Sequence, residues 1–315
     1  MTQFDATSTT DQVIEGVSLA GKTAVVTGAS AGLGVETCRA LASVGARVVM
    51  LARDEAKLAA ALATLQASLP DAVFETAIVD LADFDSIRAA APALLEQCPS
   101  IDLLINNAGV MACPLMRTAQ GHEMQFGTNH LGHFLLTALL APSLVASGSA
   151  RVVNLSSAGH KFANFNADDP DYRERDYDKW QAYGESKTAN ALFSVGLDAR
   201  LRERGVRAFA VHPGVIMTEL SRHMDESDFE LLSSRSPGDE PLTFKSVEQG
   251  AATSVWAATA ADLAGKGGIY LENCQIAEPA VQGGSSGVES YAVDEAAAER
   301  LWALSESLVG QSLGY

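Results

Sequence analysis

The strongest constraint on the fold is a regular alternation between short β-branched runs and stretches rich in alanine and leucine, which starts at Lys22. We expect strands at residues 23–27, 47–51, 73–79, 101–106, 151–155 and 206–211. Helical periodicity occupies residues 32–44, 55–68 and 83–97, a long region ending at 146, and residues 183–204. Alternation at this spacing predicts an α/β fold, with helices on both faces of one parallel sheet.

The alternation continues without a linker, so we expect a single domain at residues 19–315. The preceding residues 1–18 are rich in Thr, Ser and Asp and are expected to form a flexible tail. Polar stretches at about 161–179 and 221–241 interrupt the rhythm as inserted loops. Ligands often bind where such loops gather. The two stretches are therefore either lids and pocket walls or surface decoration.

Charge and composition exclude several functional classes. The formal net charge of −17 argues against a nucleic acid or an anionic membrane as a partner. The first residues lack a secretory signal, and the most apolar helical stretch, 134–145, contains Pro142 and is too short to span a bilayer. Four cysteines without paired spacing fit a reducing compartment. We therefore expect a cytoplasmic protein with no membrane association.

Two histidines have the spacing of a pair of metal ligands. His130 and His133 are spaced so that they share one helix face, as a metal pair would. No further cysteine, histidine or carboxylate group completes a convincing site in the sequence. We therefore expect no metal. His160 and His212 are expected to be pocket-lining or structural residues.

A glycine-rich loop directly follows the first predicted strand. Residues 27–34 read Thr-Gly-Ala-Ser-Ala-Gly-Leu-Gly and lead into a helix. Glycines allow backbone amides to approach a pyrophosphate, and the N-terminus of the helix stabilises its negative charge. The position of this loop, between strand and helix at the first crossover, indicates a dinucleotide site.

The end of the second predicted strand indicates which dinucleotide is bound. An acidic residue at this place would bind the adenosine ribose and favour NAD, but the sequence has Ala52 followed by Arg53. A guanidinium suits a 2′-phosphate, which favours NADP(H) over NAD(H). The alternative is an exposed arginine at the start of a helix.

Tyr183 and Lys187 are four residues apart in a predicted helix and can lie side by side on one face. A nearby positive charge favours the phenolate and lowers the tyrosine pKa from its usual value of about 10. Such a phenol would exchange a proton near neutral pH, as carbonyl and alcohol chemistry requires.

Further segments carry a family resemblance. They are Asp80-Leu81, Asn106-Asn107-Ala108-Gly109, Asn129 within Thr-Asn-His-Leu-Gly, Ser157, and His212-Pro213-Gly214 with Thr218. In this order, and with the features above, the chain resembles the short-chain dehydrogenase/reductase family over nearly all of residues 19–275. Ser157 and Tyr183 are 26 residues apart, which is similar to the retinol dehydrogenase/WW-domain oxidoreductase branch.

The resemblance implies a single Rossmann-type, doubly wound parallel sheet and an NADP(H)-dependent alcohol dehydrogenase or carbonyl reductase. Its substrate would be a bulky, mostly apolar ketone or aldehyde, interconverted with the alcohol by hydride transfer. Ser157 would bind the substrate carbonyl, and Tyr183 would give that oxygen its proton. Lys187 would lower the pKa of Tyr183 and bind the nicotinamide ribose. Asn129 would anchor a water in a proton relay towards Lys187.

The resemblance also implies the residues that line the site. The cofactor would contact Gly28, Ser30, Gly32, Leu33, Gly34, Arg53, Asp80, Leu81, Asn107, Ala108, Gly109, Tyr183, Lys187, Pro213, Gly214, Val215 and Thr218. The substrate would contact Ser157, Tyr183, Met111, His160 and Phe162.

Two other functions remain open at the level of sequence. One is a non-catalytic protein that binds NADP(H) as a redox sensor or scaffold, and the other is an epimerase or dehydratase that uses the cofactor transiently. Many relatives are dimers or tetramers built on the helices around Asn129 and Tyr183. A homo-oligomer of this kind, a dimer or tetramer, is therefore a further expectation, unless the insertion and the extended C-terminus block these contacts.

Overall fold

The computed structural model describes residues 4–228, 230, 244–282, 284 and 286–315. Its centre is an eight-stranded sheet in the order β3-β2-β1-β4-β5-β6-β7-β8. The strands are β1 (Thr23–Thr27), β2 (Arg47–Ala52), β3 (Phe74–Ile78), β4 (Leu103–Asn106), β5 (Arg151–Leu155), β6 (Arg207–His212), β7 (Ile269–Glu272) and β8 (Gln275–Ile276). Strands β1 to β7 pair in parallel, and β8 pairs antiparallel with β7. The predicted doubly wound sheet is confirmed.

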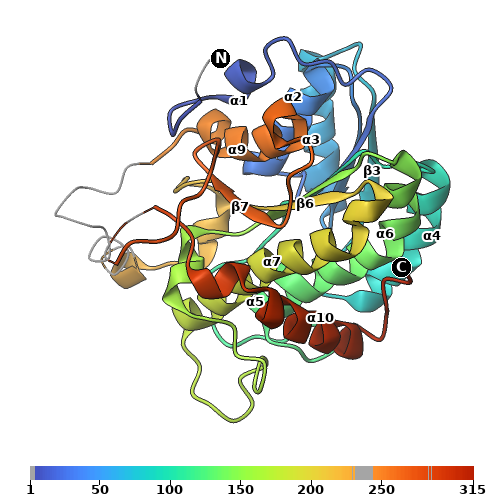
Figure 1. Ribbon diagram of the computed structural model, residues 1–315. Helices are drawn as coiled ribbons and strands as arrows, with labels where there is room; N and C mark the ends of the chain where they lie inside the picture. Colours follow the sequence, from blue (N-terminus) through green and yellow to red (C-terminus); the bar gives the residue numbers. More distant parts are fainter. Residues whose placement is uncertain (1–3, 229, 231–243, 283, 285) are drawn as a thin grey trace.

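Helices cover both faces of the sheet (Figure 1). One face carries α4 (Phe84–Gln97), α5 (Met124–Phe126), α6 (Gly132–Ser147), α7 (Lys179–Leu201) and α10 (Glu295–Val309). The other carries α1 (Thr10–Val13), α2 (Gly32–Ser43), α3 (Glu55–Ser68) and α9 (Val247–Thr259). Shorter turns are the π-helix η1 (Gly127–Leu131) and the 3₁₀ helices η2 (Ala158–Phe162), η3 (Arg202–Arg204), η4 (Glu219–His223), η5 (Ala261–Leu263) and η6 (Ser290–Val293).

Side chains alternate between two hydrophobic cores along each central strand. Val25 of β1 and Val49 of β2 belong to the core under α4, α6, α7 and α10. Val26 and Met50 belong to the core under α1, α2 and α9. Strands buried on both faces are expected to be continuous apolar runs, and residues 24–26 of β1 and 48–52 of β2 are apolar and buried.

The expectation of a flexible tail at residues 1–18 is wrong for the described residues 4–18. Helix α1 packs on α9 and α2, and the hydroxyl of Thr10 donates to the buried carboxylate of Glu36. Val13 and Ile14 are buried in the core on this face. The Thr/Ser/Asp composition of the segment misled the prediction because several of those residues form caps and turns rather than solvated coil.

The apolar helix near residue 140 is longer than the sequence indicated. Helical structure runs from Met124 to Ser147, and Pro142 lies inside it without ending it. Its length and hydropathy would allow it to cross a membrane, but 72% of the most apolar window is buried inside the fold. Such burial is typical of a helix in the core of the fold.

The inserted loop at 161–179 is tied down by ion pairs. Arg175 forms a two-pronged pair with Glu185 of α7 at 2.6 Å for each contact, and its guanidinium lies 3.8 Å from the ring centre of Tyr172. The hydroxyl of Tyr177 donates to the carbonyl of Cys113, in the loop after β4, at 2.9 Å. This insertion therefore forms a brace between α7 and the loop after β4, and one of its residues, Phe162, lies in the pocket wall. Most of the other insertion, 221–241, lies outside the described residues.

Helix α7 is enclosed on all sides. Every residue from Ala182 to Asp198 is buried, although this stretch contains Glu185, Lys187 and Asn190. The sheet lies against one side of the helix, and η2, α5 and α10 pack around the rest. The middle of α7 is thus held from every direction.

Candidate active site

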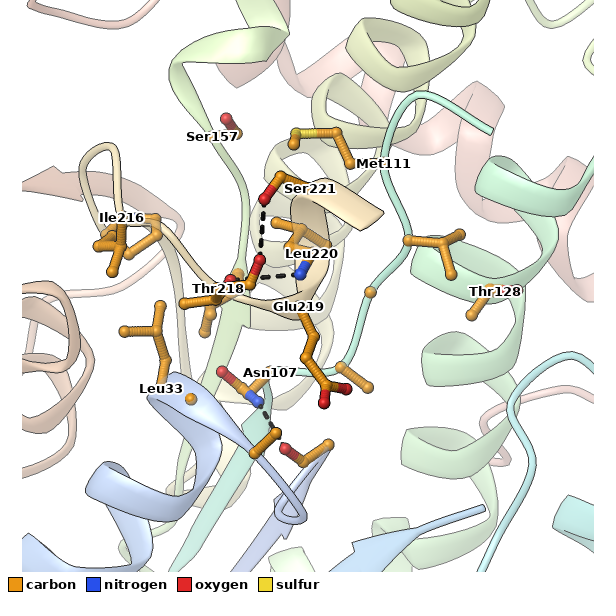
Figure 2. A pocket seen from close by; sticks show the side chains of 18 of the residues that line it. Leu33, Asn107, Met111, Thr128, Ser157, Ile216, Thr218, Glu219, Leu220 and Ser221 are labelled. Carbon is orange, nitrogen blue, oxygen red and sulfur yellow. Dashed lines mark hydrogen bonds between the residues drawn. The ribbon is translucent and has the colours of Figure 1, made fainter. Parts of the chain in front are cut away.

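The site is a cavity of about 440 Å³ at the carboxyl ends of the central strands. The loops that follow β1, β2, β4, β5 and β6 all contribute to its wall. Figure 2 shows Leu33 and Asn107 towards one end and Ser157 and Met111 towards the other, with the Thr218–Ser221 segment between them. A crevice at this edge of a doubly wound sheet is where ligands bind.

The glycine loop is pressed against the turn after β4. Gly28 has φ +66°, and a Cβ added to it would lie 2.8 Å from the Cα of Ala108. The side-chain amide of Asn107 donates to the carbonyl of Thr27 at 2.9 Å, which fixes the two loops to each other. The N-terminus of α2 therefore opens towards the cavity beside Gly32, where it favours an anionic group.

Most of the predicted cofactor residues line this cavity. They are Gly28, Ser30, Gly32, Leu33, Arg53, Asp80, Leu81, Asn107, Ala108, Gly109, Tyr183, Lys187, Pro213, Gly214, Val215 and Thr218. Gly34 does not line it, because Gly34 packs under the loop, where an added Cβ would lie 2.2 Å from the carbonyl oxygen of Gly28. Its role is to permit that close approach.

A cationic group stands at the outer end of the cavity. Arg53 directly follows β2, and no carboxylate of the described residues pairs with its guanidinium. An ion pair that sequence reasoning missed crosses the opening nearby: Lys57 of α3 donates to Glu219 of η4 at 2.9 and 3.1 Å. Nothing in the local sequence linked these two residues, which are 162 positions apart.

Tyr183 and Lys187 share one face of α7, as predicted, with the ammonium 5.7 Å from the ring centre. The predicted direction of the tyrosine pKa is wrong in the protein alone. Burial raises the pKa of Tyr183 to about 12, although a hydrogen bond with Ser157 lowers it. Burial lowers the pKa of Lys187 to about 8, and its ammonium donates to the carbonyl of Leu155 at 2.9 Å. The phenol therefore keeps its proton at neutral pH.

Ser157 and Tyr183 meet at one end of the cavity, from different elements. Ser157 caps the 3₁₀ turn η2, and its Oγ accepts a hydrogen bond from the amide of Gly159 at 3.0 Å. An added Cβ on Gly159 would lie 2.6 Å from the Tyr183 ring. The glycine therefore allows the serine turn to press against the tyrosine, which keeps the two hydroxyls together.

Asn129 lies behind the cavity, inside the π-helical turn η1. Its Oδ1 accepts from the amide of Val110 at 2.8 Å, and its Nδ2 donates to the carbonyl of Val110 and to Ser186 Oγ at 3.0 Å each. Both amide hydrogens are thus used to hold the loop after β4 against α7. The side-chain oxygen and the backbone carbonyl each accept one hydrogen bond, the carbonyl from His133 Nδ1 at 2.8 Å, and each keeps a second lone pair.

The expected substrate residues divide into two groups. Met111 and Phe162 line the cavity as predicted. His160 does not: it is buried, donates from Nδ1 to the carbonyl of Ser157 at 2.7 Å, and accepts at Nε2 from the amide of Glu289 at 3.1 Å. Its assignment as a substrate contact is therefore wrong, because backbone groups in the interior use both ring nitrogens.

Several cavity residues were missed at the level of sequence. Trp180 stands one helical turn before Tyr183, so the helix period could have identified it. It packs with Ala112 and Tyr183, and Met111, Phe162 and Met224 pack around this cluster. Further missed wall residues include Leu155, Ile216, Met217, Leu220 and Phe244, whereas Ser221, Arg222 and Met224 belong to the inserted stretch that was expected as a lid or pocket wall. This end of the cavity is therefore mostly apolar and rich in methionine.

Comparisons with known proteins identify the family of this chain. The family model described as short chain dehydrogenase matches residues 22–228. Retinol dehydrogenase 12 from Mus musculus is 42% identical over 294 residues, covering 93% of this chain and 88% of the relative. The crystal structure of an uncharacterised protein from Mycobacterium paratuberculosis covers 100% of both chains with a TM-score of 0.76 and 34% identity.

A second solved structure is a cofactor complex. The RhlG/NADP active-site complex of Pseudomonas aeruginosa has a TM-score of 0.64 and 28% identity, and the match covers 81% of this chain and 95% of RhlG. The matches extend over both the glycine loop and the Tyr183–Lys187 pair. The chain thus belongs to the short-chain dehydrogenase/reductase family of nicotinamide-dependent oxidoreductases, in its retinol dehydrogenase-like branch.

Proposed function

We propose that the protein is an NADP(H)-dependent alcohol dehydrogenase or carbonyl reductase that acts on a bulky, mostly apolar ketone or aldehyde and its alcohol. One observation carries the proposal. The hydroxyls of Ser157 and Tyr183 and the ammonium of Lys187 line the same cavity as the glycine loop and Arg53. A proton donor thus shares one enclosed space with a site suited to a dinucleotide.

The cofactor end of the cavity supports NADP(H). The close approach at Gly28 leaves room for a pyrophosphate at the N-terminus of α2. The guanidinium of Arg53, which pairs with no carboxylate in the described part of the chain, suits a 2′-phosphate. The NADP complex of RhlG is consistent with this choice. When bound, the nicotinamide supplies or accepts the hydride. Lys187 is placed to bind the adjoining ribose from α7.

The protein residues divide the proton chemistry between them. Ser157 is placed to hydrogen-bond the substrate oxygen and stabilise the negative charge that develops there. With its pKa raised to about 12, Tyr183 holds a proton at neutral pH and can donate it to that oxygen. A proton donor in this state supports reduction as the working direction. Asn129 acts indirectly, by holding Val110 and hence the loop that carries Met111.

The apolar end of the cavity supports a large hydrophobic substrate. Trp180, Met111, Phe162 and Met224 surround the space in front of Tyr183. Methionine and aromatic side chains adapt to large apolar ligands. The retinol dehydrogenase name of several relatives is consistent with a long apolar aldehyde. We further propose that the enzyme is cytoplasmic and acts without nucleic acid or membrane, in keeping with its charge of −17.

The reaction class is tested by NADPH consumption with all-trans-retinal, decanal and a set of aromatic ketones, using purified protein. Tyr183→Phe removes the transferable proton and leaves the ring packing intact. We expect it to bind NADPH with unchanged affinity and to lose at least about 100-fold in kcat. Undiminished turnover in this variant would exclude Tyr183 as the proton donor. Saturable NADPH binding without turnover of any compound by the wild type would favour the sensor alternative.

The cofactor assignment has its own test. Replacing Arg53 by Asp reverses the charge at the predicted 2′-phosphate position. We expect the ratio of kcat/KM for NADPH over NADH to fall by about 100-fold, which corresponds to roughly 3 kcal/mol. Lys57→Met is a matched control that removes a nearby cation already paired with Glu219. An unchanged cofactor ratio in Arg53→Asp would show that the 2′-phosphate is bound elsewhere or not at all.

A further inference from the structure

The peptide bond that follows Ser157 is held by two histidines. Its carbonyl, on Ser157, accepts a hydrogen bond from His160 Nδ1 at 2.7 Å. Its amide, on Ala158, donates to His212 Nδ1 at 3.1 Å. Both polar groups of one peptide unit are thus bound by imidazoles from different elements, η2 and the end of β6.

The partners of His160 fix which ring nitrogen carries its proton. The carbonyl of Ser157 can only accept, so Nδ1 must donate, and the Tyr270 hydroxyl, 3.2 Å from the same nitrogen, can then only accept from it. The backbone amide of Glu289 can only donate, so Nε2, 3.1 Å away, must be unprotonated. His160 is therefore the neutral tautomer with its hydrogen on Nδ1.

The partners of His212 require the opposite tautomer. Its Nδ1 faces two backbone amides, that of Ala158 at 3.1 Å and that of Gly214 at 3.3 Å. Neither amide can accept, so Nδ1 must be unprotonated, and a neutral ring carries its hydrogen on Nε2. Protonation would place an N–H against two N–H groups.

Burial keeps both rings neutral. Burial lowers the pKa of His160 to about 4, although the hydrogen bond with Ser157 acts in the opposite direction and raises the pKa. It lowers the pKa of His212 to about 3, and the nearby positive charges of Lys245 and Lys161 act in the same direction. Both rings therefore keep their donor and acceptor assignments through the neutral pH range.

We infer that His160 and His212 are positioning residues that clamp the Ser157–Ala158 peptide from both sides and so aim the Ser157 hydroxyl at the substrate oxygen. This inference rests on the proposed role of Ser157. Neither imidazole needs to touch the substrate, since each acts through the backbone of the serine. Displacement of a reacting group by about 1 Å can cost about 100-fold in rate, so a rigid serine turn has kinetic value.

The clamp also connects the serine to distant parts of the chain. The carbonyl of His160 accepts from the hydroxyl of Tyr291 at 2.8 Å, and Glu289 binds its ring, so residues 289–291 support the turn from outside the sheet. The Nδ1 of His212 is shared between Ala158 and Gly214 of the predicted cofactor loop. One imidazole thereby links the serine turn to the cofactor segment.

The tautomers can be tested without any substrate, by nitrogen NMR of the full-length protein labelled with ¹⁵N-histidine. We expect two neutral rings of opposite tautomer, assigned by loss of one signal in His160→Asn and of the other in His212→Asn. Neither signal should titrate near the ordinary histidine pKa of about 6.5. The same tautomer in both rings, or titration of either near neutrality, would overturn the clamp independently of whether the enzyme reduces carbonyls.

Variants test whether the clamp acts through Ser157. An asparagine amide can occupy the place of Nδ1, whereas a glutamine amide reaches the place of Nε2. We therefore expect His160→Gln and His212→Gln to lower kcat for the most rapidly reduced compound of the panel by at least about tenfold. The Asn variants should recover most of that loss. His122→Asn, which alters a buried histidine paired with Asp171 outside the cavity, is the control for general damage.

A double-mutant cycle separates positioning from loss of structure. If His160 acts by aiming the Ser157 hydroxyl, His160→Gln should have little further effect on kcat in a Ser157→Ala background. NADPH affinity should stay within about threefold in all His160 variants, because His160 does not line the cofactor site. Equal losses in the presence and absence of the Ser157 hydroxyl would refute the positioning role and leave His160 as a structural residue.

Discussion

Lys187 carries a charge with a proposed functional role at a location that disfavours charge. Its side chain is buried, and burial lowers its pKa to about 8 from 10.5, so the folded protein holds a partly destabilised ammonium. The carbonyl of Leu155 that it binds also accepts from Asn190 at 2.9 Å. Removal of the ammonium would therefore leave no unpaired acceptor at Leu155.

We expect Lys187→Met to stabilise the protein at pH 7 by up to about 3 kcal/mol while abolishing most turnover. The pH dependence gives the sign. Between pH 8 and 10.5 the unfolded lysine is protonated and the folded one is not, so wild-type stability rises with pH in this range. The extra stability of Lys187→Met relative to wild type should therefore decrease as the pH rises from 8 to 10.5. Urea denaturation at pH 7 and pH 10 measures it, and a variant less stable than wild type at pH 7 would contradict the prediction.

The identity of the site residues was largely predictable from sequence, but their hydrogen bonds were not. Ser157, Tyr183 and Lys187 meet as expected because motif spacing and helix period fix which elements carry them. His160 was misplaced because its partners, Tyr270 and Glu289, come from segments more than 100 residues away. Local spacing contains no information about such contacts.

Among the elements, the insertion at 161–179 carries the most concentrated set of ionic contacts near the site. Glu185 has a side-chain exposure of only 4% and depends on Arg175 for neutralisation. Because Glu185 lies on α7 two residues after Tyr183, the insertion directly supports the helix that carries the proposed proton donor. The sequence predicted the existence of this insertion but offered no means of choosing between a lid or pocket wall and surface decoration, and it did not predict a brace.

We expect Arg175→Met to destabilise the fold by roughly 3–5 kcal/mol, because it leaves the Glu185 carboxylate buried and unpaired. The double variant Arg175→Met/Glu185→Met removes both charges and should recover most of that loss. Thermal denaturation of the single and double variants provides the comparison. A double variant as unstable as Arg175→Met would show that packing on Tyr172, not charge, is the main contribution of the arginine.

The ends of helices and strands were predicted correctly where the local sequence pattern is strong. Strand β1 and helix α3 begin and end where the sequence predicted, because turn and capping residues flank each of them. Helix α9 was missed, although Ser246 and Gln249 form a capping box at its start. Its run of small residues has weak amphipathic character, so only the capping signal was available.

At the scale of the whole molecule, the C-terminal helix α10 determines which part of the surface is available to a second copy of the chain. Trp302 packs at 4.9 Å from Phe134 of α6 and at 5.9 Å from Phe193 of α7, measured between ring centres. Arg200 lies 4.1 Å from the Trp302 ring and pairs with Glu299 at 2.7 Å. The chain therefore covers, with its own helix, part of the face on which the sequence resemblance implied a homo-oligomer.

We expect the protein to be a monomer of about 33 kDa in sedimentation equilibrium. Trp302→Ala should open a cavity beside Phe134 and destabilise the fold by roughly 3–5 kcal/mol. Its melting temperature should be independent of protein concentration, as in the wild type. A wild-type dimer at micromolar concentration, with concentration-dependent melting, would contradict this prediction.

The enclosure of α7 has a consequence for how the enzyme loses activity. Because the sheet, η2 and α10 pack around residues 182–198, the amides of this helix can exchange with solvent only when much of the molecule opens. Tyr183 and Lys187 thus belong to the last cooperative unit to unfold. Heat inactivation and global unfolding should therefore have the same activation barrier, so a protein that is still folded should keep α7, with Tyr183 and Lys187, intact.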